Sequence, residues 1–327
     1  MYDTLVFSGG GPAAIAFVGS VKYLEHIGSM DSVRTFVGTS AGAIMALLCA
    51  IGMTSDEVRA WLLHHVCSGQ LASFDADGIL EFAERLGIDD GENVTGCIRA
   101  TLTERGFSAD PTFLQFAKST GKHLVVCASN LTEARHAYFS VDNEPSMSVL
   151  LAVRMSFGIP ILFTPITYRG CMYVDGGMLN NCPVDYSCST RSTSNTLALD
   201  IMLASDKAVE IKGPCDYVCL LLRTLFLRAN ASSQSIPSAP PSASRVTKVD
   251  VTPPHDSRGL LWQSFSFTNF AFDVSDDYIN ARIQHGYDSL QAALEEGITD
   301  GLHPVTSALP ETHAVSQNRI REQKSTP

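Results

Sequence analysis

The sequence predicts a three-layer α/β/α fold with a central, largely parallel sheet and helices on both faces. Residues 4–7 and 33–37 are short apolar runs of the kind that form buried strands. Each run is followed by a glycine-containing turn and then by an apolar helix pattern. Two strand–turn–helix units in succession are typical of a parallel sheet that is covered by helices.

The other elements are expected from the same kinds of pattern. The first two helices are predicted where apolar residues recur with helical spacing, at residues 13–27 and 43–51. A helical layer is predicted next, with helices at residues 55–65, 77–86 and 111–118. Further strands are predicted at residues 124–128, 137–141, 171–174 and 196–202, and further helices at residues 146–155 and 276–296.

The chain is predicted to form one large domain followed by a tail. Its 327 residues, of which 45% are hydrophobic, are enough to bury a sizeable core. Residues 231–244 are almost entirely Ser, Ala and Pro, a composition that predicts a mobile loop within the domain. The polar stretch 301–327 predicts a disordered tail, so we place the domain at residues 1–300.

Composition argues against several functional classes. A net charge of −11 disfavours general nucleic-acid binding and simple electrostatic docking on an anionic membrane. We expect no transmembrane segment and no signal peptide, because no apolar run is long enough and the N-terminus has no basic region. The nine cysteines form no metal-ligand cluster, so we expect no metal site and a reducing, cytoplasmic location.

The strongest motif is the G-x-S-x-G run formed by Gly38, Ser40 and Gly42, between a predicted strand and a predicted helix. Flanking glycines allow a strained turn to hold a serine at the end of a strand, with a helix N-terminus behind it. This arrangement is typical of a nucleophilic serine. A turn of small residues that only allows close packing of the strand and the helix would have the same sequence pattern. The catalytic interpretation of the motif therefore needs support from other residues.

That support comes from Gly9, Gly10 and Gly11, which follow the first predicted strand. A glycine run lets backbone N–H groups approach a developing oxyanion. The expected donors are the amides of Gly10, Gly11 and Ala41, because the next residue in the run is a proline without an N–H.

Nucleotide binding is a competing hypothesis for the same glycines. Gly9-x-Gly11-x-x-Ala14 fits a loose dinucleotide fingerprint. That fingerprint calls for an acidic residue at the end of the second strand, whereas this strand runs into the serine motif, and no GK[ST] follows the glycines. Nucleotide binding is therefore the weaker interpretation.

Asp175 is the candidate base, because it directly follows a predicted strand and precedes Gly176 and Gly177. Taken alone, an Asp-Gly pair favours a hairpin turn. A Ser-His-Asp triad with His255 or His285 is an alternative. Neither histidine lies in a recognisable motif, so a surface position is the stronger interpretation of both.

Taken together, these motifs resemble the patatin-like phospholipase family. The resemblance covers residues 4–183 clearly and rests on the order of four features along the chain. These are Gly9-Gly10-Gly11, the Gly38-x-Ser40-x-Gly42 elbow, the Ser156 to Pro160 stretch before Phe163-Thr164-Pro165, and Asp175-Gly176-Gly177 with Asn180 and Pro183. It implies a Ser-Asp dyad without histidine, with Ser40 as nucleophile and Asp175 as base. The implied oxyanion hole is Gly9, Gly10, Gly11 and Ala41, with Gly38, Gly42, Gly176 and Gly177 supporting the turns.

The resemblance further implies calcium-independent hydrolysis of fatty-acyl esters in phospholipids, of the phospholipase A type, as part of lipid catabolism. No cofactor is implied, and the expected partner is lipid at a membrane or micelle surface. Two alternatives stay open: a triacylglycerol lipase or transacylase with the same dyad, and a catalytically silent lipid-binding protein. Ala13 and Ala14 depart from the family, where many members carry a basic residue and a glycine.

Residues 218–226 add an apolar helix face whose role is open. It fits packing in the core better than contact with a lipid interface, although both remain possible from the pattern alone. Peripheral association with membranes is therefore an alternative to a purely cytoplasmic location.

Overall fold

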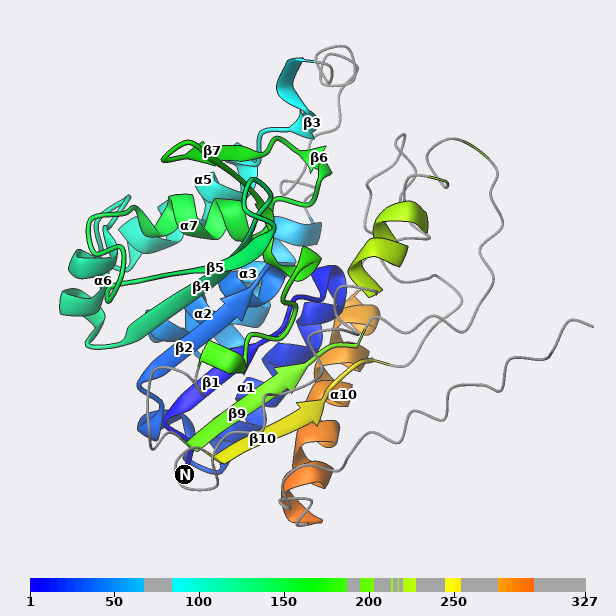
Figure 1. Cartoon of the computed structure of the whole chain (residues 1–327). Helices are drawn as coiled ribbons and strands as arrows, with labels where there is room; N and C mark the ends of the chain where they lie inside the picture. The colour runs from blue at the N-terminus through cyan, green and yellow to red at the C-terminus, as the bar shows by residue number, and fades with distance from the viewer. Residues whose placement is uncertain are drawn as a thin grey trace, which may run out of the picture.

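The computed structural model describes residues 1–67, 84–186, 195–202, 213, 217, 220–227, 245–253 and 276–296. In this part of the chain a central, mostly parallel sheet is flanked by helices, which confirms the predicted fold class (Figure 1). The predicted loop 231–244, the predicted tail 301–327 and most of the predicted helix 77–86 lie outside the described residues.

The central sheet contains eight strands, and seven of them follow the order β10-β9-β1-β2-β4-β8-β7. Its strands are β1 (Thr4–Phe7), β2 (Thr35–Thr39), β4 (His123–Asn130), β5 (Arg135–Ser140), β7 (Ile166–Tyr168), β8 (Cys171–Asp175), β9 (Asn195–Asp200) and β10 (Arg245–Asp250). Strands β10, β9, β1, β2 and β4 are parallel, whereas β5 and β8 pair with β4 in the antiparallel sense. Strands β3 (Gly87–Asp89) and β6 (Ile161–Phe163) form a separate small parallel sheet.

The helices follow the predicted order, with two kinds of difference. The α-helices are α1 (Ala16–His26), α2 (Ala41–Ala50), α3 (Ser55–Cys67), α5 (Glu92–Glu104), α6 (Phe113–Thr120), α7 (Val149–Ser156) and α10 (Asp276–Glu295). Short 3-10 turns are η1 (Gly11–Ile15), η2 (Met30–Ser32) and η3 (Gly176–Met178). The first predicted helix begins as η1 and continues as α1. Helix α5 and strands β3, β6, β7 and β10 were not predicted individually. None of the helices in the described ranges has the length and apolar character needed to cross a bilayer.

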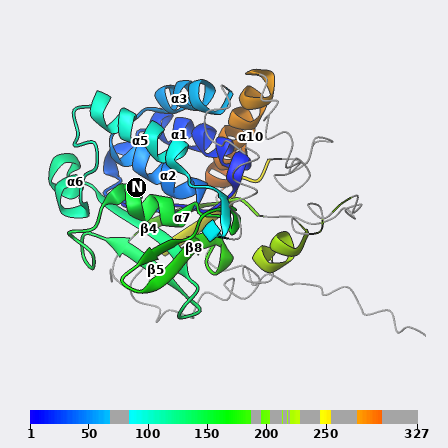
Figure 2. The same ribbon diagram turned by 90° about the horizontal axis from the view of Figure 1, so that it is seen from above.

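Side chains alternate between the two faces of the sheet, as strand geometry requires. Leu5 and Phe7 of β1 belong to the large cluster beneath the helices, whereas Val6 belongs to a second cluster that includes Val184 and Tyr186. Figure 2 shows α1, α2, α3, α5 and α10 together on one face. The continuous apolar runs of the parallel strands are explained by burial on both faces.

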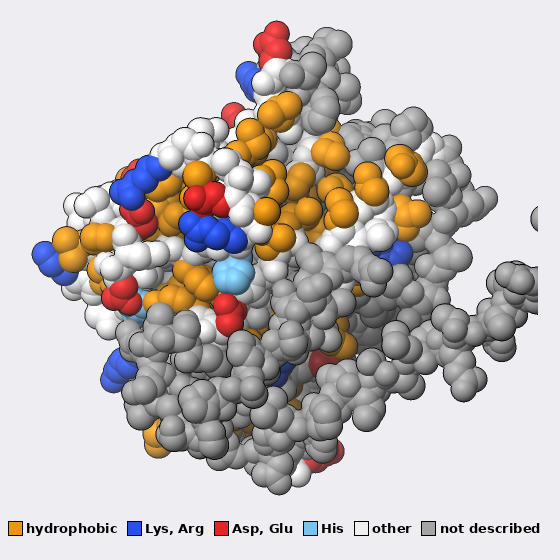
Figure 3. Space-filling view, in the orientation of Figure 1, with side chains coloured by type: hydrophobic (Ala, Val, Ile, Leu, Met, Phe, Trp, Pro, Cys, Tyr) orange, Lys and Arg blue, Asp and Glu red, His pale blue; other side chains and the backbone are white. Residues whose placement is uncertain are grey.

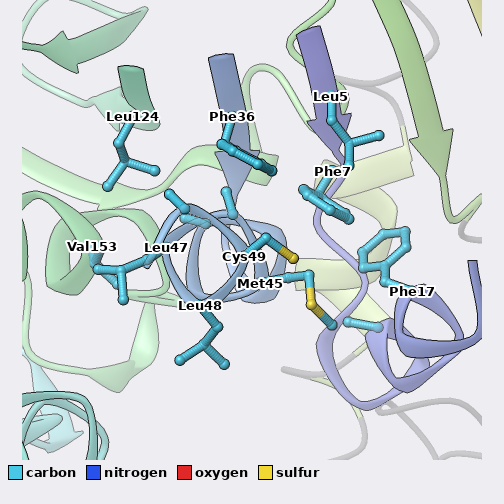
Figure 4. Close-up of a cluster of buried hydrophobic side chains, with 14 of the residues drawn as sticks. Leu5, Phe7, Phe17, Phe36, Met45, Leu47, Leu48, Cys49, Leu124 and Val153 are labelled. Atoms are coloured by element: carbon cyan, nitrogen blue, oxygen red, sulfur yellow. The ribbon is translucent and has the colours of Figure 1, made fainter. Parts of the chain in front are cut away.

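The main core forms where α2 lies across the central strands (Figure 4). Phe7, Phe36 and Leu124 extend from three neighbouring strands, and Leu47 and Leu48 of α2 pack in the same cluster. Helix α2 is apolar on nearly every side because it is enclosed by the sheet and the surrounding helices. The helix that begins at the serine motif is thereby held rigidly on the sheet.

Helices α1 and α10 touch backbone to backbone. A Cβ atom placed on Gly19 would lie 1.7 Å from the carbonyl oxygen of Ile283, and one placed on Gly286 would lie 1.9 Å from that of Ala16. The hydroxyl of Ser20 donates a hydrogen bond to the carbonyl oxygen of Gly286 at 3.1 Å. The last described helix is therefore fastened to the first.

Candidate active site

Ser40 lies in a strained turn between β2 and α2. Its backbone has φ +56° and ψ −127°, a conformation that residues with a side chain rarely adopt. A Cβ on Gly38 would lie 2.3 Å from the carbonyl oxygen of Gly42, and a Cβ on Gly42 would lie 2.3 Å from that of Ser8. The turn therefore needs glycine at both flanking positions. It places the serine at the N-terminus of α2, the positive end of the helix dipole.

The side chain of Ser40 is in direct contact with Asp175, which ends β8. The Ser40 hydroxyl donates to Oδ2 of the carboxylate at 2.6 Å, and the amide of Gly177 donates to Oδ1 at 2.7 Å. A Cβ on Gly176 would lie 2.4 Å from the carbonyl oxygen of Cys127, so the chain after Asp175 passes too close to β4 for a side chain. The Ser40 hydroxyl and the Asp175 carboxylate are thus joined across 135 residues of sequence.

Burial determines the acidity of this carboxyl group. Asp175 is 1% exposed and Ser40 is 7% exposed. Removal from water raises the pKa of Asp175 to about 7, although the hydrogen bonds from Ser40 and Gly177 act in the opposite direction. A carboxylate with a pKa near neutrality is suited to act as a general base at neutral pH.

Helix α7 and the residues after it hold both partners in place. The hydroxyl of Ser156 accepts a hydrogen bond from the amide of Ser40 at 2.9 Å and donates to the carbonyl oxygen of Cys127 at 2.6 Å. The amide of Asp175 donates to the carbonyl oxygen of Gly158 at 2.8 Å. The Ser156–Gly158 segment therefore links β4, the serine turn and the end of β8.

The glycine run lies against the nucleophile. A Cβ on Gly9 would lie 3.2 Å from Cβ of Ser40 and 2.5 Å from the side-chain oxygen of Asn181. Asn181 binds Gly9 twice, because its backbone carbonyl oxygen accepts from the Gly9 amide at 2.9 Å and its side-chain amide donates to the Gly9 carbonyl oxygen at 3.0 Å. The loop after β1 and the chain after η3 are therefore locked together beside Ser40.

Other candidate residues lie away from this pair. His285 is on α10, where its Nε2 forms a hydrogen bond with the carbonyl oxygen of Thr252 at 2.8 Å. His255 lies outside the described residues. Ala13 and Ala14, which replace the basic residue and glycine of many family members, are buried in η1. In the described residues, the Ser40 hydroxyl contacts the Asp175 carboxylate and not His285.

Neither a metal site nor a disulfide is found in the described ranges. No group of three or more His, Cys, Asp or Glu side chains there is arranged to hold a metal ion. The cysteines Cys49, Cys97, Cys127, Cys171 and Cys182 are free thiols. The cytoplasmic location stays a prediction.

The structure also identifies supporting residues to which the sequence analysis assigned no role. Ser156 begins the Ser156 to Pro160 stretch of the family resemblance, and Asn181 follows Asn180 in the last motif, so both lay within motifs whose chemistry was unassigned. Isolated serines and asparagines carry no local signal for a contact with a residue more than a hundred positions away.

Comparison with known proteins places the chain in a family. The sequence profile described as patatin-like phospholipase matches residues 5–187, which is more than half of the chain. The chain belongs to this family. The predicted resemblance is confirmed, and with it a place among the patatin-like lipid hydrolases.

Two relatives and one solved structure are similar to the chain. It is 30% identical over 205 residues to probable lipid hydrolase 463L of Invertebrate iridescent virus 6, covering 62% of this chain and 69% of that protein. It is 33% identical over 201 residues to the uncharacterized protein YqhO of Bacillus subtilis, covering 56% and 66%. The crystal structure of VipD from Legionella pneumophila matches with a TM-score of 0.52 at 15% identity, covering 90% of this chain and 67% of VipD, and supports the fold alone.

Proposed function

We propose that the protein is a lipid acyl hydrolase of the phospholipase A type, which cleaves fatty-acyl esters of phospholipids through Ser40 and Asp175. The observation that carries this proposal is the buried 2.6 Å hydrogen bond from the Ser40 hydroxyl to Oδ2 of Asp175. A nucleophile in contact with a base whose pKa is near 7 is what acyl transfer at neutral pH requires. Membership of a lipid hydrolase family supports the choice of substrate class.

In the proposed acylation step, the Ser40 oxygen attacks the ester carbonyl carbon while its proton passes to Oδ2 of Asp175. The tetrahedral intermediate then collapses. The bond between the carbonyl carbon and the glycerol oxygen breaks, and the leaving oxygen takes the proton from Asp175. The products of this step are a lysophospholipid and an acyl ester on Ser40.

In the proposed deacylation step, water attacks the acyl ester and gives its proton to Asp175. The bond to the Ser40 oxygen then breaks, the serine recovers its proton from Asp175, and free fatty acid leaves. All transfers are assigned to groups of the chain and to water, so we expect the reaction to proceed in the presence of a calcium chelator.

The oxyanion that forms in both steps needs preorganised donors. We assign this role to the amides of Gly10, Gly11 and Ala41, which belong to the glycine run and to the first turn of α2. The amide of Gly9 already donates to Asn181, so Gly9 contributes by allowing the loop to approach Ser40 closely. The N-terminal end of the α2 dipole adds favourable potential at the same place.

Release of fatty acid from phosphatidylcholine vesicles in EDTA tests the proposal. We expect activity in the wild type and a loss of at least about a thousandfold in both Ser40→Ala and Asp175→Asn, since each removes one half of the dyad. A fluorophosphonate probe should label the wild type and not Ser40→Ala. Circular dichroism and the melting temperature establish that both variants are folded, and full activity in either one would contradict the dyad.

The same assays separate the alternatives. Faster turnover of triacylglycerol than of phosphatidylcholine, or transfer of the acyl group to an added alcohol, would indicate the lipase or transacylase with the same dyad. Lipid binding without probe labelling and without release of fatty acid would indicate the catalytically silent protein. The lipid at a membrane or micelle surface is the proposed partner in each case.

A further inference from the structure

The exposed apolar side chains of the described structure concentrate in one stretch of the chain. Nine large hydrophobic residues are exposed in the described part, and four of them are Met202, Tyr217, Leu221 and Leu225. Hydrophobic side chains also gather over the upper part of the face shown in Figure 3. Clustered exposed apolar residues mark interaction sites, whereas single ones need no explanation.

Three of these residues lie on one side of a helical segment, which Figure 1 draws in yellow-green. Tyr217, Leu221 and Leu225 follow one another at intervals of four residues and are 58%, 46% and 46% exposed. Thr224 shares this side, and its hydroxyl donates to the backbone carbonyl four residues earlier at 2.7 Å, so it does not depend on water for a partner. We call these four residues the docking face. It contains no charged residue.

The opposite side of the same segment packs beside the candidate active site. Leu222 and Phe226 are each 5% exposed. A Cβ on Gly177 would lie 2.9 Å from Cε1 of Phe226, and the amide of Gly177 is the group that binds the Asp175 carboxylate. The segment therefore joins an apolar outer surface to the turn that carries the proposed base.

We propose that the docking face attaches the protein to a zwitterionic phospholipid surface. This inference extends the proposed function, because it names the surface from which the substrate is taken. Two leucines and a tyrosine on one side of a helix are suited to the headgroup boundary, where the tyrosine hydroxyl stays hydrated. The net charge of −11 and the absence of a basic residue among the four described residues of the face favour a surface without net charge over an anionic one.

Binding to vesicles of diether phosphatidylcholine tests the inference, because ether lipids bind without being hydrolysed. We expect Leu221→Glu and Leu225→Glu each to weaken binding by about tenfold, since each replaces buried apolar area with a charge in the interface. Thr224→Leu should strengthen binding by about threefold, a gain that misfolding does not produce. Leu114→Glu and Leu131→Glu are matched controls, because both leucines are similarly exposed elsewhere and should bind as the wild type does.

Hydrolysis of a water-soluble p-nitrophenyl butyrate ester separates this inference from the proposed function. The Leu221→Glu and Leu225→Glu variants should keep this activity while they lose activity on vesicles. A wild type that binds vesicles but hydrolyses neither substrate would contradict the proposed function and would still support the docking face.

Three results would overturn the docking face itself. The first is equal vesicle binding by the wild type and the glutamate variants. The second is wild-type binding that requires anionic lipid. The third is a wild-type dimer that the glutamate variants convert to monomers with no change in vesicle binding, which would make a second copy of the chain the occupant.

Discussion

Asp175 is 1% exposed at the end of β8, and this burial determines the pH range in which the proposed reaction runs. Its pKa is raised to about 7, so the carboxyl is protonated in acid and cannot accept the Ser40 proton there. We therefore expect kcat/KM for a soluble ester to rise with pH and to level off above an apparent pKa near 7. Initial rates between about pH 5 and pH 9 measure this profile. A rate that stays constant down to about pH 5 would contradict the role of Asp175 as base.

We propose Ser156 as a positioning residue, because its hydroxyl accepts a hydrogen bond from the backbone amide of Ser40, the proposed nucleophile. Ser156→Ala removes the acceptor for the Ser40 amide and leaves the strained turn less constrained. We expect kcat for the soluble ester to fall by about tenfold to a hundredfold, with KM little changed and with the apparent pKa near 7 preserved. Steady-state kinetics and the rate of fluorophosphonate labelling measure the effect.

Ser20→Ala is the matched control for this change. Ser20 is also fully buried and also loses a hydrogen bond, but it lies between α1 and α10 and has no contact with the dyad. It should lower the melting temperature and leave kcat near the wild-type value. Equal kcat in Ser156→Ala and the wild type would show that the elbow holds its geometry without this contact.

The role of a residue could be predicted from the sequence where the residue lies in a local sequence motif. Ser40 between Gly38 and Gly42 is a compact motif, and the collisions that a Cβ would make at both glycines explain why the pattern is visible in the sequence. Asp175 was a candidate base from its place after a predicted strand, but its assignment to a dyad with Ser40 and without histidine came from the family resemblance, because no local pattern joins residues so far apart. Ser156 and Asn181 received no role for the same reason.

At the scale of elements, the contact between α1 and α10 leaves no room for side chains at its centre. Gly286→Ala would place a methyl group 1.9 Å from the carbonyl oxygen of Ala16, which belongs to a helix backbone and cannot rotate away. We expect a loss of about 3 kcal/mol in the free energy of unfolding, measured by urea denaturation. Gly96→Ala in α5 is the control, since no atom lies within 4 Å of its added Cβ. This control should be neutral or stabilising by about 1 kcal/mol.

Equal stability of the two alanine variants would contradict the close approach of α1 and α10. Activity on the soluble ester provides a second measurement. The helix contact lies away from the dyad, so the folded fraction of Gly286→Ala should retain its kcat.

Elements with continuous apolar runs were predicted well, and short or polar ones were not. Strands β1 and β2 are buried throughout, and α2 is apolar on nearly every side. Strand β10 has only two apolar residues, the valines at positions 246 and 249, without strict alternation, and it follows a stretch rich in Ser and Pro, so it resembles a continuation of the loop. Strand β3 has three residues, and it pairs with β6 more than seventy positions later, a contact that no local pattern encodes. Helix α5 contains a central glycine and several β-branched residues, which weaken the helix pattern.

For the whole molecule, the net charge of −11 opposes approach to anionic lipid. We expect vesicle hydrolysis at low ionic strength to fall several-fold when about a fifth of the phosphatidylcholine is replaced by phosphatidylglycerol. Raising the salt concentration to about 0.5 M should reduce this difference, because the Debye length shortens. Hydrolysis of an uncharged soluble ester is the control and should not change with salt. Faster hydrolysis of the anionic vesicles would contradict a purely apolar attachment.

The order of strands also affects the chain during its synthesis. Ser40, the proposed nucleophile, is synthesised before Ser156 and Asp175, which follow it by 116 and 135 residues, and β9, which completes the pairing of β1, comes later still. A nascent chain that carries only the serine turn has a nucleophile without its base. Under the proposed mechanism, a chain that ends before Asp175 lacks the base and should not hydrolyse lipid, so activity is acquired only once synthesis has passed β8.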